Sequence, residues 1–144
     1  MIKKNKKGQS LFEIILALGL ITLILTAVVA LASLSIKNSS FSHSQTIATR
    51  YSDSAMESLR EEKESDWTSF YNNALSSPKW CFNDPSWDNA DPGNCSDSIL
   101  DTNFEREINF TIIGPREVQV MINVNWQDPS GYHEVSTTSD FTSY

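Results

Sequence analysis

The chain has 144 residues and a formal net charge of −7, from 18 acidic and 11 basic residues. Four lysines lie among the first eight positions, so the remaining 136 residues hold seven basic and eighteen acidic side chains, a net charge of −11. Nucleic-acid binding needs a basic surface that displaces counterions from phosphates, so this balance argues against a nucleic-acid partner. The length suits one small domain preceded by a distinct N-terminal segment.

An apolar run follows the lysine-rich start. Ile14 to Ile36 are 23 residues without a charge, and as a helix they would extend roughly 35 Å, enough to cross a bilayer core. Lysines before the run and acidic sequence after it predict a cytoplasmic N-terminus. The run is longer than a secretory signal core, and its nearest small-x-small site, Ala30-Leu31-Ala32, lies inside it. We therefore expect a retained membrane helix rather than a removed signal peptide.

One acidic residue, Glu13, lies at the start of this apolar helix, five residues after Gly8. A carboxylate within a membrane costs on the order of 3 kcal/mol on insertion scales, and such groups usually face a partner. Two interpretations are open. The side chain extends to the aqueous interface, or it meets a positive group within an assembly of helices.

The segment KKGQSLFE, residues 6–13, resembles the class III signal of type IV prepilins and pseudopilins. The basic leader and four later positions fall in register with that signal: Gly8, Ser10, Leu11 and Glu13. The resemblance implies that a prepilin peptidase cuts after Gly8 on the cytoplasmic side. It also implies that Gln9 becomes a methylated N-terminus and that Glu13 faces the N-terminal amine of a neighbouring subunit.

The resemblance divides the chain into three parts. They are a cytoplasmic leader (1–8), a transmembrane and filament-core helix (9–36) and an extracytoplasmic pilin-like domain (37–144). One position departs from the family, which most often has phenylalanine where this chain has Gln9. A free N-terminal glutamine can cyclise and lose its basic amine, and methylation would prevent that loss.

The helical pattern continues beyond the apolar run. Apolar and small residues recur at three- and four-residue spacing: Phe41, Ser44, Ala48, Tyr51, Ala55 and Leu59. No proline occurs before Ser77, so we expect one helix from about Ser10 to about Lys63, its second half amphipathic and packed on a sheet. The charge run 60–64 reads as a solvated helix end. The segment 55–60 with Asp66-Trp67 resembles minor pilins of the pilus-modification type.

Residues 77–103 are rich in Pro, Asp, Asn, Ser and Gly, which indicates turns without regular structure. Cys81 and Cys95 bracket the middle of this region, and in an exported domain they would form a disulfide; two free thiols are the alternative. The loop aromatics Trp80, Phe82 and Trp87 either anchor the loop to the sheet or form a contact patch for a partner. Calcium is a weaker alternative, with oxygen ligands from Asp84, Asp88, Asp91, Asn94 and Asp97.

Three alternating segments after residue 103 predict strands. The first places Phe104, Arg106 and Ile108 on one face, the second runs over 117–126, and the third, shorter, runs from Tyr132 to Thr138 with Tyr132 and Val135 available for packing. Turn signals at Gly114-Pro115 and at 128–131 separate them. The expected fold is therefore α+β and pilin-like, with a long N-terminal helix packed on a three-stranded antiparallel sheet.

No motif for catalysis, phosphate binding or metal binding is present, so we expect no enzyme activity and no cofactor. His133 lies beside a turn and reads as solvent-facing rather than as a base. The resemblance implies a minor pilin or pseudopilin, a structural and assembly subunit of a type IV pilus-like filament. A binding module at the filament tip, a type II secretion pseudopilin and a tethered enzyme are the alternatives.

The same resemblance implies where the chain resides and what it contacts. The expected location is the bacterial cytoplasmic membrane, as a single-pass protein that becomes periplasmic or extracellular in the assembled filament. The expected partners are a prepilin peptidase, other pilin or pseudopilin subunits and inner-membrane lipid. The resemblance covers pilus, secretion and competence systems alike.

Overall fold

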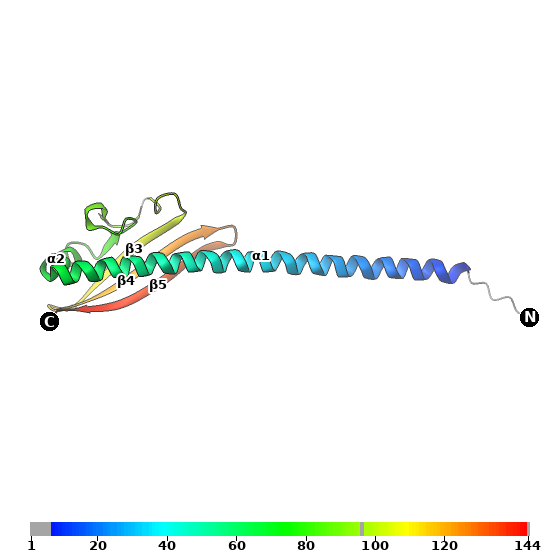
Figure 1. Cartoon of the computed structure of the whole chain (residues 1–144), viewed down its shortest axis with the longest axis horizontal. Coiled ribbons are helices and arrows are strands. Elements are labelled where there is room, and N and C mark those ends of the chain that lie inside the picture. The colour runs from blue at the N-terminus through cyan, green and yellow to red at the C-terminus, as the bar shows by residue number, and fades with distance from the viewer. Residues whose placement is uncertain (1–6, 96, 144) are drawn as a thin grey trace, which may run out of the picture. The chain divides into compact units, whose positions relative to one another are not determined.

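The computed structural model describes residues 7–95 and 97–143, and the side chains from residue 11 onward. The chain divides into two compact units, Met1–His43 and Ser44–Tyr144. Helix α1 (Lys7–Ser65) is followed by α2 (Trp67–Ser76), β1 (Lys79–Cys81), the 3-10 turn η1 (Trp87–Asn89), β2 (Asp91–Pro92), β3 (Phe104–Gly114), β4 (Glu117–Asp128) and β5 (Gly131–Thr142) (Figure 1). The α+β class and the long N-terminal helix are confirmed.

Helix α1 is continuous over the predicted range and a little longer at each end. It ends where Asp66 takes an extended backbone conformation and caps the next helix, its Oδ1 accepting hydrogen bonds from the amides of Thr68 and Ser69 at 2.9 and 3.2 Å. This N-cap satisfies two of the amides that a helix start leaves free. The chain therefore starts a second helix, α2, which the sequence pattern did not predict.

The sheet has five antiparallel strands in the order β2-β1-β3-β4-β5, so the prediction of three strands was wrong. The two extra strands are short, three residues in β1 and two in β2, and both lie in the region predicted to be turns only. Segments of two or three residues are too short for an alternating pattern. Strand β1 belongs to the sheet because it pairs with β3, and β2 belongs to it because it pairs with β1.

The core lies between one face of the sheet and the helical residues of the C-terminal unit. Alternate residues of β3 and β4 point inward, and Ala48, Ala55 and Leu59 of α1 are fully buried against them. The other buried apolar residues are Met56, Phe70, Ala74, Cys81, Phe82, Phe104, Ile108, Phe110, Val118, Val120, Ile122, Val124, Trp126 and Phe141. The predicted amphipathic stripe is confirmed from Ala48 onward, whereas Phe41, at its start, is exposed.

Strand β5 differs from the prediction in length and in which face is buried. It extends over twelve residues, and register pairs Val124 with Val135 and Trp126 with His133, so the odd-numbered residues point inward. Tyr132, predicted to pack, is therefore 64% exposed. His133, predicted to face solvent, lies half-buried with its ring 5.2 Å from that of Trp126. Because β5 has polar residues on both faces, its sequence does not show an alternation of apolar and polar residues.

The β4–β5 turn confirms the predicted turn signal and forms a small polar cluster. Gly131 has a φ of 137°, which favours glycine. Asp128 accepts hydrogen bonds from the Ser130 amide and hydroxyl, and its Oδ1 lies 3.1 Å from His133 Nε2. The hydrogen bond from the Ser130 side chain is the largest effect and lowers the pKa of Asp128 to about 2, helped by the Ser130 amide and by His133 and opposed by burial, the second-largest effect.

This depressed pKa predicts a pH dependence of the turn. The folded state stabilises the ionised carboxylate of Asp128. Its contribution to the free energy of unfolding is therefore complete above the pKa of the unfolded chain, near 4, and is lost as the pH falls to about 2. The melting temperatures of the wild type and the Asp128→Ala variant should therefore differ at pH 5 and converge by pH 2. A difference that stays constant across this range would show that the ionised carboxylate contributes nothing.

Candidate functional site

The N-terminal unit presents an apolar surface that no other part of that unit covers. Its large apolar side chains, from Leu11 to Ile36, are between 52% (Leu16) and 70% (Ile36) exposed. Burying one such side chain is worth about 1.5–3 kcal/mol, so this surface is unstable in water. By length and composition α1 is able to cross a membrane. Lipid or other apolar helices are the surroundings that this surface requires.

Three hydroxyl side chains on this apolar stretch are hydrogen-bonded within the helix. Thr22 donates to the carbonyl of Gly19, Thr26 to that of Leu23 and Ser33 to that of Val29, each at 2.9 Å. A hydroxyl without a partner is costly in hydrocarbon, and these bonds to preceding carbonyls remove that cost. The three polar side chains are therefore compatible with an apolar environment.

The predicted processing and assembly residues lie at the start of α1. Gly8 and Gln9 are in its first turn; the Gln9 side chain lies outside the described part, as does the backbone of leader residues 1–6. Glu13 lies on the same helix and is exposed. Among the side chains that the structure describes, no hydrogen bond or ion pair reaches Glu13. Its carboxylate is thus available for a partner from outside that part of the chain.

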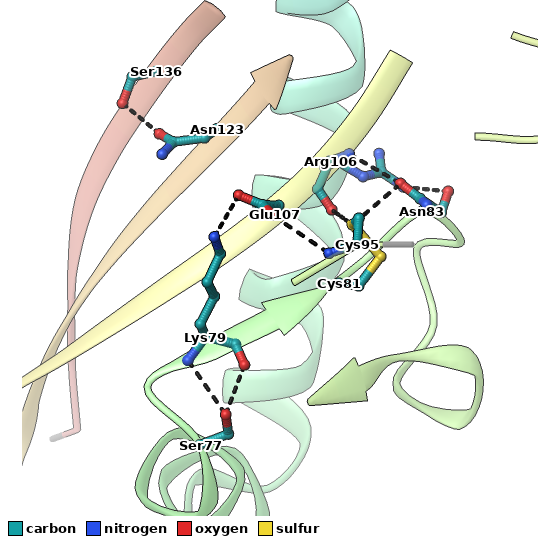
Figure 2. Close-up of polar contacts among 9 residues, drawn as sticks. All are labelled: Ser77, Lys79, Cys81, Asn83, Cys95, Arg106, Glu107, Asn123 and Ser136. Carbon is teal, nitrogen blue, oxygen red and sulfur yellow. Dashed lines mark hydrogen bonds and ion pairs between the residues drawn. A yellow bond between two sulfur atoms is a disulfide. The ribbon is translucent and has the colours of Figure 1, made fainter. Parts of the chain in front are cut away.

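The predicted disulfide is confirmed in the C-terminal unit. Cys81 at the end of β1 is bonded to Cys95, 14 positions later in the sequence, with Cα atoms 4.7 Å apart. Figure 2 shows the polar contacts around this bond. Glu107 accepts a hydrogen bond from the Cys95 amide at 3.4 Å. Its carboxylate also forms an ion pair with Lys79 Nζ at 2.8 Å. Glu107, in β3, therefore connects this strand to β1 through Lys79 and to the loop before β3 through Cys95.

The loop aromatics pack into the domain, which favours their predicted anchoring role over a contact patch. Phe82 is 1% exposed, and the half-buried Trp80 and Trp87 pack against the core. The Trp87 ring lies 5.1 Å from that of Trp80, 5.5 Å from that of Phe82 and 6.0 Å from that of Phe110. Such ring pairs fix the loop over β3.

A buried arginine, Arg106, holds the same loop to α1. Its guanidinium donates to the carbonyls of Phe82 and Asn83 and, at 2.8 Å, to that of Tyr51 in α1. The Arg106 amide donates to Asn83 Oδ1 at 2.9 Å (Figure 2). Burial lowers the pKa of Arg106 to about 10, with a partly opposing effect of Asp84, so it stays charged at neutral pH. The alternation of β3 predicted its inward position but not its partners.

We expect a measurable loss of stability when the disulfide is removed. In the chain-entropy treatment, cross-linking a loop of this length stabilises the fold by about 3 kcal/mol. The double variant Cys81→Ser/Cys95→Ser should lose about that much of the free energy of unfolding in urea. A reductant should lower the wild type to the same level and leave the double variant unchanged. A loss below about 1 kcal/mol would contradict a stabilising role.

No metal centre was found among the described side chains: no group of three or more His, Cys, Asp or Glu is arranged to hold an ion. The loop aspartates considered as calcium ligands include Asp84, whose carboxylate instead accepts a hydrogen bond from Asn89 at 2.8 Å. His133 makes its contacts with the turn residues Asp128 and Ser130.

Comparison with known proteins gives no assignment. No protein-family model matches the chain. No curated protein and no solved structure matches it either.

Proposed function

We propose that this protein is a prepilin-like subunit, a minor pilin or pseudopilin that a prepilin peptidase cuts after Gly8 and that assembles through its apolar helix. The observation that supports this most is Glu13 on an apolar helix surface that the N-terminal unit leaves uncovered. A plain membrane anchor has no need of an acid at this position, because each intramembrane carboxylate costs free energy.

Cleavage would create a positive partner for Glu13, which has none among the described side chains. The new N-terminus would be the amine of Gln9, four residues before Glu13. Four residues are about one helical turn and roughly 6 Å of rise, so the amine and the carboxylate would lie at the same end of the helix. In a bundle of parallel helices, a small axial offset would bring the carboxylate of one subunit to the amine of another. An uncut chain lacks this cation, so processing would be required for assembly.

The C-terminal unit suits an exported subunit. It carries the disulfide and an acidic surface, and its core is fixed by the loop aromatics and Arg106. A disulfide persists in an oxidising compartment, which agrees with a location outside the cytoplasm. A pseudopilin of a secretion system and a filament-tip binding module share these features, so they remain alternative forms of the same proposal.

The test of processing is a pair of glycine variants. Gly8→Val places a branched side chain before the proposed scissile bond, whereas Gly19→Val adds the same group where nothing lies within 4 Å of the new Cβ. With a prepilin peptidase in the same membranes, we expect the wild type and Gly19→Val to be shortened and Gly8→Val to stay full length. Equal processing of all three chains, or of none, would contradict the proposed site.

A further inference from the structure

A cavity of about 250 Å³ opens on the outer face of the sheet, opposite the core. It lies where the ends of β3, β4 and β5 meet the loop before β3. Seven residues line it: Ser98, Asn103, Glu105, Asn125, Trp126, Gln127 and Tyr132. Register places Glu105, Asn125 and Glu134 side by side across three strands. The volume is below the roughly 300 Å³ at which sites for drug-sized ligands begin, so a small polar group fits it better.

Asn125 is the unusual residue of this cavity. It is 6% exposed although it belongs to the outer face of the sheet, and its Oδ1 is buried with no hydrogen-bond partner among the described residues. A buried acceptor without a donor is costly, and most buried polar groups in native proteins have a hydrogen-bond partner. The lining amide therefore lacks a donor that a ligand would supply.

The charge around the cavity selects a positive ligand. Glu105 lines it and Glu134 lies beside Asn125 in the next strand, while no basic residue is among the lining residues. No ion pair joins either glutamate to a described basic side chain, in contrast to Glu107, which pairs with Lys79. Burial, and after it Glu134, Glu107 and Glu105, raises the pKa of Tyr132, in agreement with a negative local potential.

Tyr132 completes the site with an aromatic face. Its side chain is 64% exposed at the mouth of the cavity, opposite Gln127 in the hairpin. An exposed aromatic ring next to carboxylates attracts a cation through its negative π-face. A guanidinium group is planar, stacks on such a ring and carries five donors in a fixed fork, which suits adjacent carboxylate and amide acceptors better than a compact ammonium does.

We propose that this cavity binds the guanidinium group of an arginine side chain, held between the carboxylate of Glu105 and the ring of Tyr132, with Asn125 Oδ1 accepting a hydrogen bond once the Asn125 amide turns toward the cavity. The site lies entirely within the C-terminal unit. It is therefore independent of the proposed function of the N-terminal helix and goes beyond it.

The probe is N-acetyl-arginine amide, titrated into the full-length protein in a nonionic detergent. N-acetyl-citrulline amide is the matched control, because it keeps the planar shape and loses the charge. We expect saturable shifts of the side-chain amide resonance of Asn125 and of the indole resonance of Trp126 with the arginine probe only. Equal shifts with both probes, or none with arginine, would overturn the proposal.

Two variants test the contacts. Glu105→Gln should weaken binding by about tenfold, as expected for the loss of one charged hydrogen-bond partner, whereas Glu117→Gln, with the same charge change at the far end of β4, should leave it unchanged. Should Glu105→Gln disturb folding, Tyr132→Leu at an exposed position should still weaken binding by about threefold or more. Unchanged affinity in a folded Glu105→Gln or Tyr132→Leu variant would contradict the site.

Discussion

Replacing Arg106 by methionine should lower the free energy of unfolding by about 4 kcal/mol, because it removes a buried charged donor and leaves acceptors behind. The guanidinium donates to three carbonyls that come from the loop after β1 and from α1. Methionine fills part of the volume but donates no hydrogen bond. The carbonyls of Phe82 and Asn83 would then be left unsatisfied near the core, and the loop would lose its link to α1.

Two further variants separate the geometry of Arg106 from its charge. Arg106→Lys keeps the charge but cannot reach three diverging carbonyls, so it should lose more than half of the same free energy. Arg116→Met, at an exposed position, should change stability by less than about 0.5 kcal/mol. The measurement is urea unfolding of the full chain, followed through the tryptophan signal. A loss below about 1 kcal/mol in Arg106→Met would contradict a structural role for this buried guanidinium.

The second large effect concerns assembly. Glu13→Gln removes the negative charge with almost no change of shape, and its membrane cost should fall, since the amide is neutral. We expect the variant to insert and to be processed like the wild type. Its recovery in sheared filaments should fall by at least about tenfold, because the new amine would lose a charged partner within an apolar bundle.

The conservative variant makes this test specific. Glu13→Asp keeps the charge on a shorter side chain, so it should recover part of the assembly that Glu13→Gln loses. The fraction of each processed chain in sheared filaments, relative to the membrane fraction, is the quantity to measure. Recovery of Glu13→Gln at the wild-type level would show that the carboxylate has no role in assembly.

The sequence predicted the elements whose pattern is long enough to repeat. The uncharged run and the stripe from Ala48 to Leu59 each extend over several turns, and both appear in α1. Strands β3 and β4 alternate over eleven and twelve residues and were predicted correctly. Short or polar strands gave no such signal: β1 and β2 are too brief, and β5 alternates between polar residues on both faces.

The contacts within the C-terminal unit required the structure. The alternation of β3 placed Arg106 on the inner face, but its acceptors are 23, 24 and 55 positions away in sequence. Register places Asn125 on the outer face of β4, and only the structure shows that it is buried and that its amide oxygen has no hydrogen-bond partner among the described residues. Such roles depend on tertiary proximity, which a one-dimensional pattern does not contain.

The most direct test of the proposed function is the intact mass of the full chain from membranes with and without a prepilin peptidase. The account predicts that the peptidase removes Met1 to Gly8, with or without the further mass of one methyl group on Gln9. An intact leader in the presence of the peptidase, or cleavage after Ala32 instead, would contradict it. The chain would then be a simple membrane-anchored or secreted domain.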